Sequence, residues 1–227
     1  WIYGLESIYN PVAGLDLSDA AKARMHWTGY LRRENLNDPV PKDDPYVMIT
    51  PGGGGDGKAM VDHVLSAYEK DPDLKPDALL IYGPFLTGDD RATFENRAAK
   101  LNGRVRTVGF DSHMETLMTG AVGVVAMGGY NTFCEILSFD KPAVIIPRTV
   151  PRLEQYIRAK RAEDLGLMRM IHKERDGDSA DVMIKAIRDL HNQKPPSAVQ
   201  ISGLLDGLDV VAKRTKHLLA KAAGTSE

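Results

Sequence analysis

The feature that most constrains this chain is a regular alternation of short apolar runs with segments of helical pattern. The alternation begins after Pro45, and each apolar run is only four or five residues long. Runs of this length are typical of strands that are buried on both faces of a sheet. We expect strands at residues 46–50, 78–82, 104–108, 122–126 and 143–146, and a last short strand at 167–171.

Helical patterns fill the intervals between these strands. We expect helices at residues 58–68, 91–101, 114–118, 132–138, 154–165, 180–190 and 204–222, and a short helix at 17–25 for which Ser18 is the N-cap candidate. Strands that alternate with helices favour a parallel sheet, and right-handed crossovers cover both of its faces. The sequence therefore predicts an α/β fold, a doubly wound, Rossmann-like parallel sheet with helices on both faces.

The same pattern divides the chain into three parts. Residues 34–45 are rich in Asn, Asp and Pro, which indicates a linker or an exposed loop. We expect a connecting segment at residues 1–45, a Rossmann-like domain at residues 46–192 and a helical extension at residues 193–227.

The overall charge and composition exclude several classes of protein. The 227 residues carry a net charge of -2, which does not favour general binding to nucleic acid. No apolar run approaches the roughly 20 residues of a membrane-spanning helix. The one cysteine, Cys134, allows no disulfide within the chain, and the six histidines do not cluster with acidic residues at metal-ligand spacing. We therefore expect no metal site and a cytoplasmic protein, with peripheral contact to a membrane left open.

A glycine-rich loop follows the first predicted strand. Its residues are Gly52, Gly53, Gly54, Gly55, Asp56 and Gly57. Glycines allow a ligand to approach the backbone closely, and the N-terminus of the next helix suits a pyrophosphate. The alternative is a turn that binds no ligand. The spacing is not that of a Walker A loop, and the acidic residue that an NAD site needs is missing after the second strand, so an NAD-linked domain is disfavoured.

Two further loops at strand ends carry polar residues. In the first, Gly128 and Gly129 precede a helix that Asn131 or Thr132 could cap, and Glu135 lies about one turn inside it. A carboxylate there can accept two hydrogen bonds from a ribose diol, or it can merely favour the helix dipole. In the second, Glu154 and Gln155 open the next helix and could reach a polyhydroxylated ligand, although a solvated loop explains them equally well.

These loops share a specific order and spacing along the chain. A Gly-Gly helix start with Thr132 and Glu135 is followed by the strand 141–147 and then by Glu154-Gln155-Tyr156. In this respect the chain resembles the C-terminal, donor-binding domain of the MurG-like family-28 glycosyltransferases, which is one half of a GT-B fold. One departure is Glu154, where the family frequently has a glutamine.

The resemblance implies that a nucleoside-diphosphate sugar, most often a UDP-sugar, lies across the strand ends as substrate, with no cofactor and no bound metal. It places Glu135 at the ribose, Phe110 at the base and Gln155 at the sugar, and it identifies Arg33, or Arg32 in the alternative register, as the arginine near the start of the domain. It places Asn131, Thr132 and the backbone of Gly129 and Tyr130 along the pyrophosphate, and it counts Gly128 among the residues that bind the nucleotide sugar.

The resemblance also implies that the acceptor site and the catalytic base lie on an N-terminal domain that this chain lacks. The catalytic residues therefore cannot be named, and the hydroxyl acceptor can be a sugar, a lipid or another molecule. We expect the polypeptide alone to bind the donor weakly and to transfer nothing. The alternatives are a UDP-sugar 2-epimerase-like GT-B enzyme, which shares the donor site, and a non-catalytic module that binds a nucleotide sugar.

Overall fold

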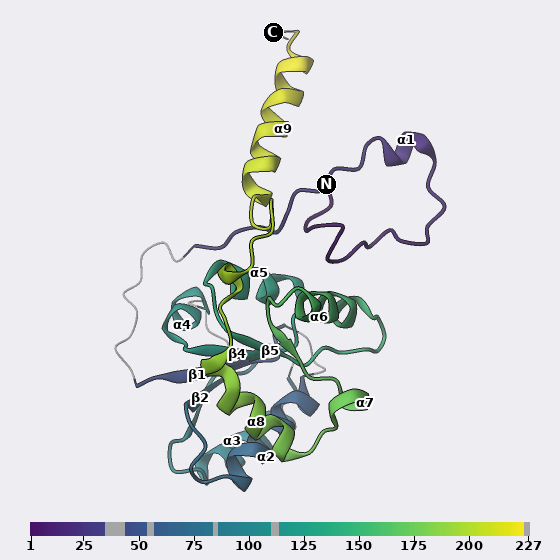
Figure 1. The fold of residues 1–227 in the computed structure, drawn as a ribbon. Coiled ribbons are helices and arrows are strands. Elements are labelled where there is room, and N and C mark those ends of the chain that lie inside the picture. Colours follow the sequence, from purple (N-terminus) through teal and green to yellow (C-terminus); the bar gives the residue numbers. More distant parts are fainter. Residues whose placement is uncertain (35–43, 54–56, 84–85, 110–113, 225–227) are drawn as a thin grey trace.

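A six-stranded parallel sheet forms the centre of the protein (Figure 1). The structure is a computed structural model that describes residues 1–34, 44–53, 57–83, 86–109 and 114–224. The strands are β1 (Tyr46–Thr50), β2 (Asp77–Ile81), β3 (Val105–Val108), β4 (Gly123–Ala126), β5 (Ala143–Ile145) and β6 (Arg169–Met170). Every strand pair is parallel, in the order β3-β2-β1-β4-β5-β6. The predicted Rossmann-like sheet is thus confirmed.

Helices cover both faces of this sheet, as the alternating sequence predicts. Figure 1 shows α2, α3 and α8 on one side and α4, α5 and α6 on the other. Their bounds are α2 Lys58–Lys70, α3 Gly88–Ala99, α4 Met114–Gly120, α5 Tyr130–Ser138, α6 Glu154–Asp164 and α8 Ala180–Asp189. The remaining helices are α1 Asp19–Lys22, α7 Lys173–Asp176, α9 Gly207–Ala222 and the 3-10 turns η1 Leu190–Asn192 and η2 Pro196–Ala198.

Two apolar clusters, one on each face, explain why the central strands β1, β4 and β5 are buried throughout and almost entirely apolar. In β1, Val47 and Ile49 pack against α2 and α8, while Met48 packs toward α4 and α5. All five residues of β1 are buried. A strand whose alternate side chains enter two separate cores cannot show polar alternation, which is the physical origin of the continuous apolar run.

The strand order reverses between β1 and β4, in the middle of the sheet. The chain runs outward from β1 to β3 and then returns to start again at β4, on the other side of β1. Thr50 and Ala126, the last residues of β1 and β4, lie side by side in the register. In open α/β sheets, the carboxyl ends of the strands at such a reversal leave a crevice in which ligands bind.

Several helix starts differ from the sequence predictions: α3 begins three residues early, at Gly88, α9 begins three residues late, at Gly207, and α5 and α1 differ as well. Helix α5 begins at Tyr130 with Gly129 as its N-cap, so neither Asn131 nor Thr132 caps the helix as predicted. Both residues instead lie in the first turn of α5. The helix begins two residues earlier than predicted, directly after the glycine pair. Ser18 does cap α1, with its Oγ 3.3 Å from the Ala21 amide nitrogen, but that helix spans four residues and not nine.

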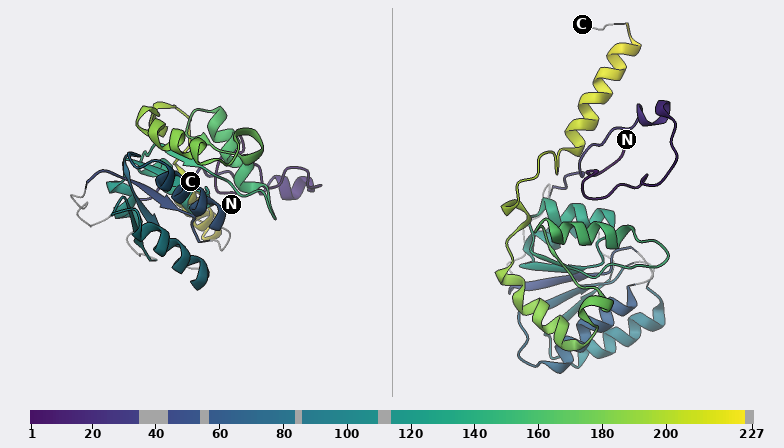
Figure 2. Two further views of the ribbon diagram at one scale, coloured as in Figure 1. Left: turned by 90° about the horizontal axis from the view of Figure 1, so that it is seen from below. Right: turned by 45° about the vertical axis from the view of Figure 1, so that its right-hand side comes forward.

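The first segment of the chain packs against the stretch that leads into α9. The Tyr30 amide donates to the Leu204 carbonyl at 2.8 Å, and the Gly207 amide donates to the Tyr30 carbonyl at 3.1 Å. Figure 2 shows α9 projecting away from the sheet with the N-terminal segment at its base. Within the described ranges, every helix is too short or too polar to span a bilayer.

Candidate functional site

Two glycine loops meet at the crevice between β1 and β4. The loop after β1 turns at Gly52, which has a φ of +73°, and a Cβ built on Gly52 would lie 3.7 Å from the Thr132 Oγ1 on α5. The residue that follows β2 on this edge also contacts the loop, because a Cβ on Gly83 would lie 2.0 Å from the Gly52 carbonyl oxygen. The fold therefore brings the first glycine loop against the first turn of α5.

The two glycines of the loop between β4 and α5 have different roles. One has a backbone conformation that favours glycine, and the other borders open space. Gly128 has a φ of +75°, and a Cβ there would lie 2.8 Å from the Ile145 Cγ2. Gly129 has ordinary extended geometry, and a Cβ there would meet nothing within 4 Å. Since the first N–H groups of a helix have no partner inside it, the start of α5 offers donors and a partial positive charge beside this open space.

This difference predicts that alanine costs more stability at Gly128 than at Gly129. Gly128→Ala is expected to destabilise the fold by about 2 kcal/mol, because a side chain at positive φ and a contact with Ile145 both cost free energy. Gly129→Ala should cost less than about 1 kcal/mol. Urea unfolding of the two variants measures both values, and equal losses would contradict the assigned backbone geometry.

Glu135 lies on α5 below the glycine pair and is half-buried. Burial raises the pKa of its carboxyl above the ordinary value, the nearby Glu115 carboxylate raises it further, and the Arg33 guanidinium lowers it. Among the described residues, no side chain donates a hydrogen bond to this carboxylate. The arrangement leaves an acceptor group next to the helix start, where a hydroxyl-bearing ligand can reach it.

Arg33 lies along the outer side of α5, whereas Arg32 is exposed. Its amide donates to the Ser138 Oγ at 2.9 Å, and its Nη2 donates to the Asn131 Oδ1 at 3.1 Å. Its Nε is buried and has no hydrogen-bond partner among the described residues. The geometry therefore favours Arg33 over Arg32 as the arginine that belongs to the site.

Glu154 and Gln155 already make contacts within the protein. The Glu154 carboxylate pairs with the Arg158 guanidinium one turn further along α6. The Gln155 Oε1 accepts a hydrogen bond from the Arg148 amide at 3.1 Å, which holds the loop between β5 and α6. Both residues lie at this edge of the sheet, as predicted, but part of each side chain serves to shape the loop.

Sequence reasoning did not identify Arg158 as part of the site. Its side chain is 3% exposed, and its Nη1 donates to the Gly128 carbonyl at 3.1 Å. The i, i+4 spacing from Glu154 was the only signal in the sequence, and such pairs usually lie on the helix surface.

A cavity of about 820 Å³ opens beside the glycine pair. It lies between the N-terminal segment and the start of α6, and it shares Tyr130, Glu154 and Arg158 with the site described above. Its other lining side chains are mostly apolar and include Trp1, Tyr3, Tyr9, Leu153 and Ile157. The cavity therefore adjoins the start of α5 at Tyr130 and the start of α6 at Glu154.

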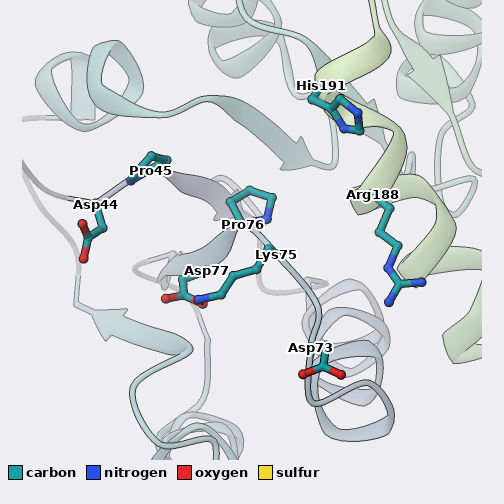
Figure 3. A pocket seen from close by; sticks show the side chains of 8 residues that line it. All are labelled: Asp44, Pro45, Asp73, Lys75, Pro76, Asp77, Arg188 and His191. Atoms are coloured by element: carbon teal, nitrogen blue, oxygen red, sulfur yellow. The ribbon is translucent and has the colours of Figure 1, made fainter.

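A second cavity, of about 730 Å³, lies at the opposite, amino ends of the strands (Figure 3). Two of its charged side chains are paired: Lys75 with Asp77 at 2.9 Å, and Arg188 with the neighbouring Asp71 at 2.5 Å. It is remote from the glycine loops, and we do not assign it to the candidate site.

Four of the predicted site residues, Gly54, Gly55, Asp56 and Phe110, lie outside the described residues. Of the remaining loop residues, Gly53 is exposed and Gly57 is the N-cap of α2. Across the part of the chain that the structure describes, no three His, Cys, Asp or Glu side chains are grouped so that they could hold a metal ion.

Comparison with known proteins identifies a family to which most of the chain is similar. The model of the glycosyltransferase family 28 C-terminal domain matches residues 49–202. An uncharacterized glycosyltransferase from Methanosarcina acetivorans is 26% identical over 219 residues, which cover 92% of this chain and 54% of that protein. The chain thus spans about half the length of this curated relative.

Solved glycosyltransferases share the fold at low sequence identity. The calicheamicin glycosyltransferase CalG4 superimposes with a TM-score of 0.60 at 16% identity, over 88% of this chain and 48% of that one. Phytolacca americana UGT2, solved with UDP-2fluoro-glucose and pterostilbene, superimposes with a TM-score of 0.53 at 12% identity, over 85% of this chain and 48% of that one.

Proposed function

Because the chain belongs to the family of glycosyltransferase family 28 C-terminal domains, we propose that it binds the nucleoside-diphosphate sugar from which a glycosyltransferase transfers a sugar. The observation that supports this most is the position of Glu135. An available, half-buried carboxylate lies next to a helix start at the reversal point of a parallel sheet. This combination provides a hydrogen-bond acceptor for a ribose diol and donors for a pyrophosphate within one crevice.

In this proposal the donor lies across the ends of β1 and β4. Glu135 accepts hydrogen bonds from the two ribose hydroxyls, and the pyrophosphate lies over Gly129 and the first turn of α5. Thr132 and Gly52, which face each other, border the phosphates on the side of the first loop. A UDP-sugar is the donor that we favour, since a structure with the same fold, Phytolacca americana UGT2, was solved with UDP-2fluoro-glucose.

The chemistry of transfer requires the departing diphosphate to be stabilised. The N–H groups and partial positive charge at the start of α5 can meet the negative charge that develops on the leaving group. We propose that this helix start performs that role without a bound metal. The acceptor hydroxyl and the base that activates it would be held by another domain of the whole protein. This chain covers only 54% of the curated relative that it matches, which leaves room for such a domain.

Isothermal calorimetry tests the proposal directly. We expect this chain to bind UDP and UDP-N-acetylglucosamine, and to bind GDP and NAD more weakly or without measurable heat. Binding of GDP in preference to UDP would support the assignment of the donor site, but it would show that the preferred base is guanine and not uracil. Binding of NAD alone would overturn the proposal, and so would a failure of every nucleotide to bind both this chain and the longer protein that contains it.

The raised pKa of Glu135 predicts that nucleotide binding weakens in mild acid. The ionised carboxylate accepts two hydrogen bonds, whereas the protonated form loses part of this capacity, so affinity should decline as the pH falls through the raised pKa. The decline should begin above about pH 4.3, the ordinary value of a glutamate. Calorimetry at steps from about pH 7.5 down to about pH 4.3, the ordinary value, measures it.

Glu135→Gln is the matched control for this pH series. The ligand phosphate also titrates in this range, but it does so equally with both proteins. The affinity of Glu135→Gln should therefore show only the ligand's own pH dependence. Identical pH profiles for the two proteins would show that Glu135 does not titrate on binding.

A further inference from the structure

Arg158 is a buried cation whose guanidinium contacts four separate segments of the chain. Its Nη1 donates to the Gly128 carbonyl at 3.1 Å, and its Nη2 pairs with the Glu154 carboxylate. The guanidinium carbon also lies 5.5 Å from the ring centre of Tyr9, 5.9 Å from that of Tyr130 and 5.7 Å from that of Phe133. The loop after β4, the start of α5, helix α6 and the N-terminal segment therefore all meet at one side chain.

The chemistry of these partners requires an arginine. A cation removed from water must be paired and hydrogen-bonded, and aromatic faces stabilise a guanidinium in the same position. The planar guanidinium donates to Gly128 and Glu154 at the same time, whereas a lysine ammonium carries its donors on a single nitrogen. Arg158 also lines the cavity beside α6, but its hydrogen bonds go to Gly128 and Glu154 and only 3% of the residue is exposed, so its main effect on a ligand is through the groups that it holds.

The contact with Gly128 determines which way the loop peptide faces. In a planar trans peptide, the carbonyl and the following N–H point in opposite directions. A Gly128 carbonyl held against Arg158 therefore directs the Gly129 N–H away from Arg158. A Cβ on Gly129 would meet nothing within 4 Å, so this glycine borders open space at the mouth of the crevice.

We propose that Arg158 is a positioning residue that orients the Gly128–Gly129 peptide and so determines how tightly the loop holds a diphosphate. The inference rests on the proposed donor site but concerns a side chain that does not touch the donor. It also assigns the Glu154 carboxylate a structural role, because that group neutralises Arg158 at the start of α6.

The test compares Arg158→Met with the unmodified chain. Methionine keeps a long, unbranched side chain among the three rings but removes both hydrogen bonds. We use whichever of UDP, GDP and dTDP binds best, together with the matching nucleoside, and measure affinities by calorimetry and NMR titration. Affinity for the diphosphate should fall about tenfold or more, whereas affinity for the nucleoside, which lacks phosphates, should change less than about twofold.

Arg97→Met is the matched control, because Arg97 also pairs with carboxylates, those of Glu69 and Asp62 between α2 and α3 on the other face of the sheet. Arg97→Met should lower thermal stability, but it should leave the ratio of the affinities for diphosphate and nucleoside unchanged. Arg158→Lys, which keeps the charge, should recover part of the diphosphate affinity. Equal losses for diphosphate and nucleoside in Arg158→Met, or no loss for either, would overturn the positioning role.

A readout without ligand separates this inference from the proposed function. In the free protein, the Gly129 amide resonance in a ¹⁵N-correlated NMR spectrum should shift in Arg158→Met and stay in place in Arg97→Met. If no nucleotide binds the unmodified chain but the Gly129 resonance moves, the proposed function fails while the orienting contact stands. If the resonance does not move, Arg158 does not orient this peptide.

Discussion

Replacing Glu135 with alanine is expected to weaken the binding of a nucleoside diphosphate by about 100-fold, or about 2.7 kcal/mol. The carboxylate is available, half-buried and next to the helix start, so two ribose hydroxyls can donate to it at once. Hydrogen bonds to a charged group contribute about 1.5–3 kcal/mol each, and part of this is recovered when water enters the vacated space. Calorimetry with UDP measures the loss.

Glu115→Gln is the control for this substitution. Glu115 raises the pKa of Glu135 through charge repulsion from α4, so its removal makes Glu135 easier to ionise. At about pH 7.5, Glu115→Gln should therefore change the affinity less than about threefold. Comparable losses in the two variants would mean that the shared negative charge, and not a specific contact of Glu135, governs binding.

Replacing Gly29 with alanine is expected to destabilise the packing of the first segment against residues 203–207 by about 3 kcal/mol. Gly29 has a φ of +83°, which costs an L-residue about 1–2 kcal/mol, and a Cβ there would lie 2.2 Å from the Gly203 carbonyl oxygen. Because that neighbour is backbone, the two segments must move apart. Hydrogen exchange of the Tyr30 and Gly207 amides, which bond across this contact, measures the change.

Gly14→Ala measures the backbone part of this effect without the steric part. Gly14 has a φ of +80° but lies in an exposed loop, and a Cβ there would meet nothing within 4 Å. It should cost only the backbone term of about 1–2 kcal/mol, and it should leave the exchange of the Tyr30 and Gly207 amides unchanged. If both alanines accelerate that exchange equally, the close contact between Gly29 and Gly203 does not hold the segments together.

The strands and the glycine loops could be predicted because local sequence determines them. A strand with two buried faces carries few polar side chains, so the run 46–50 marks β1 without any knowledge of its neighbours. A backbone at positive φ favours glycine, so Gly52 and Gly128 mark the turns at the strand ends. Glu135 could be singled out because helical spacing places it one turn below such a turn.

Contacts between residues that are distant in the chain could not be predicted in this way. The sequence does not state that Gly52 faces Thr132, or that residues 29–31 lie against residues 203–207, because each of these contacts depends on how the whole chain folds back on itself. The start of α5 at Tyr130 also differed from the prediction, since a glycine can be an N-cap without a side-chain signal.

The sequence by itself thus determined the α/β class, the positions of the strands and the loops in which a ligand could bind, because burial on two faces and positive φ restrict which residues each position accepts. Only the tertiary structure decided which of these loops meet and what holds them. Arg158 shows the reason: in the sequence it is one of many charged helix residues, and its role arises only where Gly128, Glu154 and three rings converge on it. A buried charge is tolerated only when the whole fold supplies its partners.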